Sequence, residues 1–88
     1  MKIIIIGAGE VGYHIAKSLY LENDLVIIDE DEDACLRVDE FDVQVIQGNG
    51  ANAAILEKVL IGADLLVAVT GDDEVNIVSC MAAKLIKQ

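Results

Sequence analysis

The sequence of 88 residues contains no proline, and its only aromatic residues are Tyr13, Tyr20 and Phe41. Three rings are too few to form the platform on which successive bases of a nucleic acid stack. Basic residues are also scarce, because six lysines and arginines stand against sixteen aspartates and glutamates, and the formal net charge is −10. Such a charge repels phosphate backbones and anionic lipid surfaces. We therefore expect no nucleic-acid partner.

Cysteine is sparse as well, and no long apolar run is present. Cys35 and Cys80 have neither the spacing of a metal site nor a short paired motif, so both are expected to be reduced packing residues. No apolar run approaches the roughly 18 residues that a membrane-spanning helix needs. Met1–Ile6 is too short for the core of a signal peptide. We expect a cytoplasmic protein without direct membrane insertion.

A catalytic apparatus is missing from the sequence pattern. His14 is the only histidine, and the sequence supplies no nucleophile or metal partner for it. A surface or packing role is expected for His14, against the alternative of an acid or base acting on a substrate. No Ser/His/Asp set and no metal cluster emerges from the spacing of the residues. We therefore predict a protein that is not an enzyme, with no catalytic residue and no metal.

Apolar residues make up 55% of the sequence, which predicts one packed domain over residues 1–88. Short apolar runs alternate with helical patterns four times, as in a parallel sheet covered by helices on both faces. Right-handed crossovers then give the strand order 3-2-1-4. The expected class is α/β, a Rossmann-like doubly wound parallel sheet truncated to about four βα units. The expected strands are Lys2–Ile6, Leu25–Asp29, Val43–Gln47 and Asp64–Thr70, and the expected helices are Val11–Leu21, Glu32–Asp39, Ala53–Val59 and Asp73–Lys87.

A glycine-rich segment, Gly7-Ala8-Gly9-Glu10-Val11-Gly12, directly follows the first apolar run, and Asp29 closes the second, 20 residues after Gly9. Strand, glycine loop, helix, strand and acid together are the fingerprint of a dinucleotide-binding βαβ unit. Gly7 permits the tight turn, Gly9 lets a pyrophosphate approach the main chain, and Gly12 lets the helix lie close to the sheet. The phosphates would meet free N–H groups at the helix N-terminus, and Asp29 would accept hydrogen bonds from the adenosine ribose. The alternative is a glycine turn in a βαβ fold that binds nothing.

Asp29 opens the acidic run Asp29-Glu30-Asp31-Glu32-Asp33. A ribose 2′-phosphate would meet these carboxylates with no arginine at the strand tip, so NAD(H), ATP, ADP or AMP is favoured over NADP. Asp31 is placed to cap the following helix, and the other acids suit the N-terminal end of its dipole. Arg37 lies further along this helix, either exposed to solvent or folded back toward an adenine.

Two further turns are predicted to lie beside the same crevice, because the carboxyl ends of neighbouring parallel strands meet at one edge of a sheet. After the third strand, the Asn49 amide can bond to a base and Gly50 permits close approach of the main chain. The alternative is a tight loop that caps the next helix through Asn52. After the fourth strand, Thr70 offers a hydroxyl to the ribose or pyrophosphate, and Gly71 removes a side chain near the phosphates.

The last predicted helix is capped by Asp72 or Asp73, and Asn76, one turn further on, is a candidate to point toward the crevice. The rest of this helix is apolar around more of its circumference than one sheet can cover. We hypothesise that Ile77, Met81 and their neighbours contact another chain or a segment outside this sequence. The alternative is a helix buried on its own sheet. The fourth strand would also form an apolar open edge, which favours a homo-oligomer.

Several of these segments resemble one family: the glycine loop, the acids Asp29-Glu30-Asp31, the turn Gly48–Asn52 and the stretch Val69-Thr70-Gly71-Asp72-Asp73-Glu74-Val75-Asn76. The family is the N-terminal nucleotide-binding domain (RCK, KTN or TrkA-N domain) of Trk and Ktr potassium-uptake regulatory subunits. The resemblance spans all 88 residues. It implies a cytosolic subunit that binds NAD(H) or ATP/ADP and gates a membrane potassium channel or transporter subunit.

The resemblance also implies which residues contact the nucleotide, namely Gly7 to Val11, Asp29 and Thr70-Gly71. Asn49 stands where the family usually has an aspartate, so a charge is lost on the adenine side. The family domain continues past Gln88. A homo-oligomer is implied, located in the cytoplasm and peripheral to the inner face of the cell membrane through its protein partner.

Two other functions fit parts of the sequence. One is the cofactor-binding half of an NAD-dependent oxidoreductase, which would need a substrate domain and an acid/base residue. The other is a non-binding assembly module that retains the fold. Nucleotide binding would separate the assembly module from the other two functions, and oxidation of NADH would identify the oxidoreductase.

Overall fold

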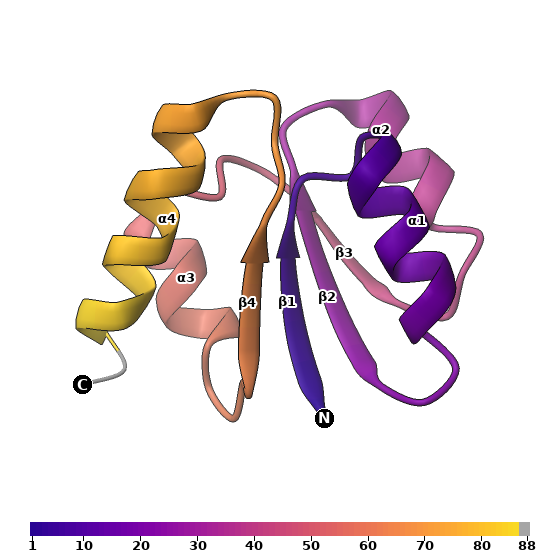
Figure 1. The fold of residues 1–88 in the computed structure, drawn as a ribbon, viewed down its shortest axis with the longest axis horizontal. Coiled ribbons are helices and arrows are strands. Elements are labelled where there is room, and N and C mark those ends of the chain that lie inside the picture. Colours follow the sequence, from indigo (N-terminus) through magenta and orange to yellow (C-terminus); the bar gives the residue numbers. More distant parts are fainter. Residues whose placement is uncertain (87–88) are drawn as a thin grey trace.

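The computed structural model describes residues 1–86 as four strands that alternate with four helices (Figure 1). In chain order these are β1 (Lys2–Ile6), α1 (Glu10–Leu19), β2 (Asp24–Asp29), α2 (Glu32–Val38), β3 (Gln44–Gln47), α3 (Ala53–Val59), β4 (Leu65–Ala68) and α4 (Asp73–Ile86). Every predicted strand and helix is therefore present. The predicted end of the last helix, at Lys87, lies outside the described residues.

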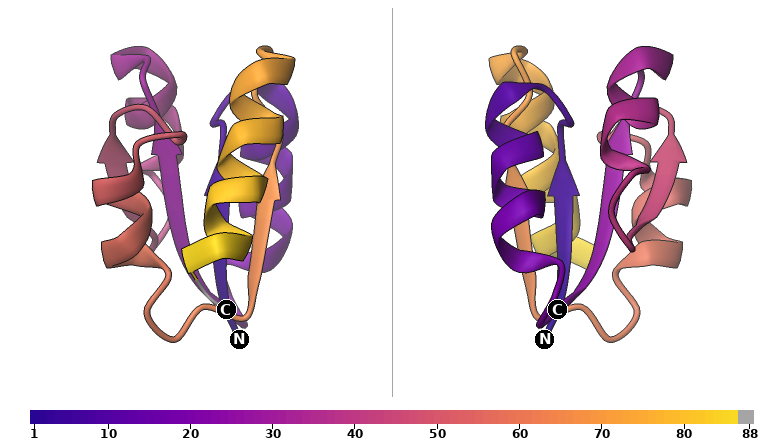
Figure 2. Two further views of the ribbon diagram at one scale, coloured as in Figure 1. Left: turned by 90° about the vertical axis from the view of Figure 1, so that its left-hand side faces the viewer. Right: turned by 90° about the vertical axis from the view of Figure 1, so that its right-hand side faces the viewer.

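The four strands form one parallel sheet in the order β3-β2-β1-β4, which confirms the predicted fold class and topology. β1 lies in the interior of the sheet, where Ile3 pairs with Leu25 of β2 on one side and with Leu65 of β4 on the other. Because all the pairings are parallel, the strands run in one direction, and their arrowheads in Figure 2 point toward the same end of the molecule. The loops that follow the strands therefore meet at one edge of the sheet.

Side chains alternate between the two faces of the sheet, because successive residues of a strand point to opposite sides. α1 and α2 cover one face, and α3 and α4 cover the other (Figures 1 and 2). The core on the α1 and α2 side contains Ile3, Ile5, Ala8, Ala16, Leu25, Ile27, Ala34 and Val38. The core on the α3 and α4 side contains Ile4, Ile6, Val26, Ile28, Leu56, Val59, Leu60 and Ala83. Burial of β1 on both faces explains why Ile3–Ile6 is an unbroken apolar run.

The strand boundaries differ from the predicted ones at β2, which begins at Asp24, at β3, which begins at Gln44, and at β4, which spans Leu65–Ala68. Val43 is excluded from β3 because its N–H donates to the carbonyl of Phe41 in a turn (2.9 Å). At the other end of the sheet, the Val69 N–H still donates to Ile6 (2.8 Å), but Thr70 bonds instead to the side chain of Asn76. β4 is therefore shorter than predicted.

Among the helices, α1 spans Glu10–Leu19 rather than Val11–Leu21, and α2 ends one residue earlier than predicted, with Asp39 as its C-cap. α1 ends where Tyr20 donates its N–H to the carbonyl of Ala16 (3.0 Å), and a turn follows. None of the helices within residues 1–86 combines the length and the apolar character that crossing a bilayer requires.

α4 packs small side chains onto the sheet and turns large apolar ones outward. Its buried residues are Ser79 and Ala83, and the helix contacts β4 and α3. Ile77 and Met81 are each 61% exposed. The apolar surface of α4 is thus wider than the sheet covers, as predicted, and the alternative of complete burial on its own sheet is wrong.

Candidate functional site

A cleft of about 220 Å³ opens at the edge of the sheet where the strands end. Its lining includes a segment from the loop after each strand: Gly9, the pair Asp29 and Glu30, the turn Gly48–Gly50 and the turn Val69–Asp72. Open α/β sheets bind their ligands at this position, where the strand order reverses. The predicted site residues that the cleft brings together are Gly9, Asp29, Asn49, Gly50, Thr70 and Gly71. The predicted residues that do not line it are Gly7, Ala8, Glu10 and Val11.

Two close backbone contacts shape the glycine loop after β1. Gly7 has a φ of 111°, and a Cβ on it would lie 2.9 Å from the main-chain nitrogen of Thr70. A Cβ on Gly12 would lie 1.9 Å from the carbonyl oxygen of Gly7. Gly12 thus lets α1 approach the glycine loop itself, whereas the sequence pattern indicated close packing on the sheet. Gly9 differs, because nothing lies within 4 Å of a Cβ built on it, so the loop stays open at this point.

The N-terminus of α1 differs from those of the other helices. The side chains of Asp31, Asn52 and Asp72 cap α2, α3 and α4 by accepting hydrogen bonds from first-turn N–H groups, which confirms the predicted caps. The N-cap of α1 is Gly9, and no side chain caps this helix. Its first N–H groups are therefore left without a side-chain acceptor, at the end where the helix dipole favours an anion.

Asp29 joins the end of β2 to the glycine loop. Its Oδ2 accepts a hydrogen bond from the Ala8 N–H at 2.7 Å, and its Oδ1 accepts one from the Asp31 N–H at 2.8 Å. Ala8 is buried, and the N–H that the motif predicts as a donor to a ligand has an acceptor inside the protein. Each carboxylate oxygen keeps further acceptor capacity, and Asp29 is half-buried in the cleft lining. The same carboxylate can hold the loop and accept from a hydroxyl.

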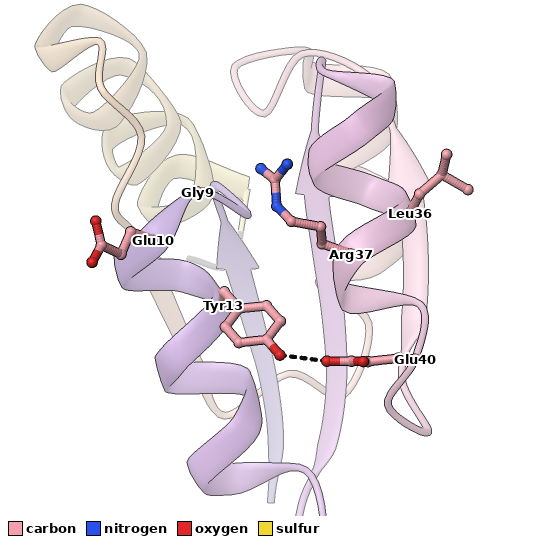
Figure 3. Close-up of a pocket in the computed structure, with 6 residues that line it drawn as sticks. All are labelled: Gly9, Glu10, Tyr13, Leu36, Arg37 and Glu40. Carbon is pink, nitrogen blue, oxygen red and sulfur yellow. Dashed lines mark hydrogen bonds between the residues drawn. The ribbon is translucent and has the colours of Figure 1, made fainter.

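Glu10 and Val11 lie beside the cleft rather than in it. Both side chains are exposed on the first turn of α1. Figure 3 shows the Glu10 carboxylate directed away from Arg37, on the far side of α1. Their main-chain N–H groups belong to the first turn of α1, which no side chain caps.

The turn after β3 is held by local contacts. Asn49 Oδ1 accepts a hydrogen bond from the Ala51 N–H at 2.8 Å, and the residue is exposed in the cleft lining. Gly50 is buried, and a Cβ on it would lie 2.2 Å from Cγ2 of Ile6. Gly50 therefore has a packing role against β1 in addition to its place in the cleft. Asn52 caps α3, so the capping alternative and the cleft position of Asn49 both hold.

Asn76 faces Thr70 and does not line the cleft. Its Oδ1 accepts from the Thr70 N–H at 2.9 Å and lies 2.6 Å from the Thr70 hydroxyl oxygen. Its Nδ2 donates to the Thr70 carbonyl at 3.1 Å. The sequence made Asn76 a candidate to point toward the crevice, and in the structure its side chain bonds to Thr70 instead. The only sequence signal for the pairing is the short separation of Thr70 and Asn76 around the start of a helix.

A second hollow of about 510 Å³ lies between α1 and α2 and shares only Gly9 with the cleft (Figure 3). Across it, the Tyr13 hydroxyl donates to the Glu40 carboxylate, and this hydrogen bond raises the pKa of Tyr13 above its ordinary value. Arg37 extends from α2 toward the Gly9 end of α1. This hollow is larger, but it is a furrow between two helices. The cleft is the better candidate because the loops of all four strands converge there.

Other residues with reactive side chains lie outside the cleft. Cys35 is buried, its Sγ donates to the Asp29 carbonyl (3.4 Å), and burial followed by the charge of Asp29 raises the pKa of its thiol. Cys80 is exposed, so the packing role predicted for it is wrong. His14 is exposed on α1, as expected, and its ring packs nearly perpendicular to that of Tyr13. Within residues 1–86, no three His, Cys, Asp or Glu side chains gather as a metal site.

Comparison with known sequences gives a family match over residues 3–88, to the TrkA-N domain. The chain is 73% identical over 86 residues to Trk system potassium uptake protein trkA homolog 1 of Methanosarcina mazei. It is 51% identical over 85 residues to the TrkA homolog of Archaeoglobus fulgidus and 41% identical over 86 residues to TrkA of Vibrio alginolyticus. These alignments cover 98%, 96% and 94% of this chain but 21%, 20% and 19% of the relatives. The chain thus spans about one fifth of the length of these relatives.

Comparison with solved structures gives Rossmann-type neighbours. The anaerobillin reductase ChuY of Escherichia coli O157:H7 has a TM-score of 0.75 at 20% identity, with 98% of this chain and 46% of that chain covered. A short-chain dehydrogenase/reductase of Saccharomyces cerevisiae has a TM-score of 0.68 at 16% identity, with 98% and 47% covered. At such identities the likeness shows the fold alone. The family match over residues 3–88, in contrast, shows that this chain belongs to the TrkA-N domain family.

Proposed function

We propose that this chain is the nucleotide-sensing part of a regulatory component of potassium uptake, and that it binds NAD(H) or an adenine nucleotide (ATP, ADP or AMP) in the cleft. The relatives named above are Trk system potassium uptake proteins. The observation that carries the proposal is that the uncapped N-terminus of α1 and the half-buried carboxylate of Asp29 meet at one cleft, which Gly9 leaves open. A phosphate and a ribose need these two kinds of partner.

Each part of the cleft suits one part of a nucleotide. The main-chain N–H groups of Glu10 and Val11 would bind a diphosphate, because they begin the uncapped helix. The Asp29 carboxylate would accept hydrogen bonds from the ribose hydroxyls. Asn49 is exposed in the lining and would bond to the base edge, and Gly71 leaves open space beside its main chain. Gly7 and Ala8 would shape the loop rather than contact the ligand.

The charge of the cleft favours some nucleotides over others. Asp29, Glu30 and Asp72 all line it. A 2′-phosphate on the adenosine ribose would be placed against these carboxylates, and close like charges oppose each other strongly where solvent is partly excluded. NAD(H) and the simple adenine nucleotides are therefore expected to bind in preference to NADP(H).

In the proposed mechanism, the nucleotide stabilises one of two arrangements of paired chains, and this difference in population is transmitted to a membrane potassium channel or transporter subunit. The exposed apolar face of α4 around Ile77 and Met81 supports the assembly of a homo-oligomer. The protein would lie in the cytoplasm, held at the inner face of the membrane by its partner. The proposal includes no catalytic step.

Isothermal titration calorimetry of the protein with NAD, NADH, ATP, ADP and AMP tests the proposal. We expect saturable binding of at least one of these ligands. A sixth titration, with NADPH, should show weaker binding than the titration with NADH. Absence of binding for all five would favour the non-binding assembly module. Enzymatic oxidation of NADH in the presence of a small-substrate pool would favour the oxidoreductase instead.

A further inference from the structure

We propose that Asn76 is a positioning residue of the cleft, which fixes the turn after β4 so that a nucleotide meets the main chain of Gly71 rather than the hydroxyl of Thr70. The identity of the ligand rests on the proposed function. The role of Asn76 in fixing the turn is independent of it, because this role is a property of the protein without a ligand.

The first support is that the Asn76 side chain forms hydrogen bonds with main-chain groups at the edge of the sheet. In a strand, the N–H and the carbonyl of one residue point to the same side, and those of the next residue point to the opposite side. The Val69 N–H donates to Ile6 of β1, so the N–H and carbonyl of Thr70 point to the opposite side, where β4 has no neighbouring strand among residues 1–86. The Asn76 amide bonds to both of these Thr70 groups, at 2.9 and 3.1 Å. One side chain thus supplies the donor and the acceptor that a neighbouring strand would provide.

The second support is that the Thr70 hydroxyl already has hydrogen-bond partners within the turn. Its oxygen lies 2.6 Å from Asn76 Oδ1 and 2.9 Å from the Asp72 carbonyl, and it accepts from the Asp72 N–H at 3.1 Å. A hydroxyl has one proton, and two acceptors inside the protein already compete for it. The N–H, the carbonyl and the hydroxyl of Thr70 all have internal partners, so its side chain acts through the shape of the turn.

The third support is what the turn leaves open. Asp72 is occupied as the cap of α4, accepting from the N–H groups of Glu74 and Val75. Gly71 is exposed in the cleft lining, and nothing lies within 4 Å of a Cβ built on it. Its φ is not positive, so the backbone conformation does not require glycine here. Glycine at position 71 therefore leaves an open space in the cleft, and a ligand would reach the main chain of Gly71 through that space.

Amide hydrogen exchange of the protein without nucleotide tests the fixing of the turn. Asn76→Ala should increase the exchange rate of the Thr70 N–H by about tenfold or more, because that N–H loses its acceptor. Asn76→Asp keeps the acceptor and should restore most of the protection. Asn23→Ala is the matched control, since the Asn23 side chain also bonds to a main-chain carbonyl, that of Leu19, away from the cleft. Unchanged exchange at Thr70 in Asn76→Ala would overturn the proposal.

Nucleotide affinity tests the role of Gly71. Gly71→Ala should weaken binding about tenfold or more while the exchange rate at Thr70 stays at the wild-type value. The double variant Thr70→Val/Asn76→Ala should bind nucleotide no more weakly than Asn76→Ala alone, because both substitutions act through the same turn. The proposal is overturned if Thr70→Val alone weakens binding as much as Gly71→Ala without a change in exchange. If the wild-type protein binds no nucleotide, the proposed function fails, and the exchange comparison still decides the role of Asn76.

Discussion

The carboxylate of Asp29 and the main-chain N–H of Ala8 are joined by a 2.7 Å hydrogen bond that ties the end of β2 to the glycine loop. The residue expected to bind the ribose thus also holds the loop that presents α1 to the phosphates. The two roles are separable by mutation, because asparagine keeps an acceptor oxygen at this position and alanine keeps none.

Asp29→Ala should weaken nucleotide binding by about 1–3 kcal/mol, the usual cost of leaving buried polar groups without a partner. It should also lower the free energy of unfolding, because the N–H groups of Ala8 and Asp31 lose their acceptor. Asp29→Asn should keep more of the stability and still lose affinity. Calorimetry and urea denaturation measure the two effects, with Asp33→Ala, an exposed residue of the same acidic run, as the control. An unchanged dissociation constant in Asp29→Ala would refute the ribose-binding role.

Gly12 and Gly9 should respond to substitution in opposite ways. A Cβ at Gly12 would lie 1.9 Å from the Gly7 carbonyl oxygen, so Gly12→Ala should lower the free energy of unfolding by about 1–3 kcal/mol. Gly9 has open space and a φ of −70°, so Gly9→Ser should leave stability unchanged or raise it by a few tenths of a kcal/mol through capping of α1. The same serine should reduce nucleotide affinity by occupying the anion-binding end of α1. Urea denaturation and calorimetry check both variants, and a Gly9→Ser protein with wild-type affinity would contradict this account.

The hydrogen bond from Tyr13 to Glu40 should make stability depend on pH at the alkaline end. Because this bond raises the pKa of Tyr13, the folded protein holds the phenolic proton more tightly than the unfolded chain does. The resulting stabilisation is complete below the unfolded pKa of about 10 and is lost as the pH rises through the folded value. Chemical denaturation between about pH 8 and pH 12 should therefore show a steeper fall in stability for wild type than for Tyr13→Phe. Tyr20→Phe, which leaves the bond to Glu40 in place, should behave like wild type, and equal slopes in wild type and Tyr13→Phe would argue against the effect.

The outward face of α4 should mediate self-association. Ile77 and Met81 are one turn apart and each is 61% exposed, so Ile77→Lys or Met81→Lys would place a charge in the apolar face. We expect either substitution to shift the protein toward monomer in sedimentation velocity experiments. Ile61→Lys, in the loop before β4 and 76% exposed, is the control and should leave association unchanged. A wild-type protein that sediments as a clean monomer at micromolar concentration would remove the basis for this prediction.

The fold follows from short-range patterns in the sequence. The run Ile3–Ile6 identifies a strand buried on both faces, the glycine loop identifies the strand-to-helix turn, and Asp31 and Asn52 sit where helix caps are expected. The strand order then follows from the handedness of the crossovers. These features depend on residues close together in the chain or on rules common to all sheets of this kind, so they can be predicted without a structure.

The partners of the polar groups around the cleft depend on contacts between separate segments. The Asp29 carboxylate accepts a hydrogen bond from the Ala8 N–H, which belongs to the predicted phosphate-binding loop. Gly50 packs against Ile6, and the Asn76 side chain forms hydrogen bonds with the main chain of Thr70. A hydrogen bond requires donor and acceptor within about 3.5 Å, and sequence spacing does not define that distance between loops. The amino-acid sequence alone therefore determined the βα units, their order and the end of the sheet where a ligand would bind. Only the tertiary structure decided which donors and acceptors at that end remain free, because each one used inside the protein is lost to a ligand.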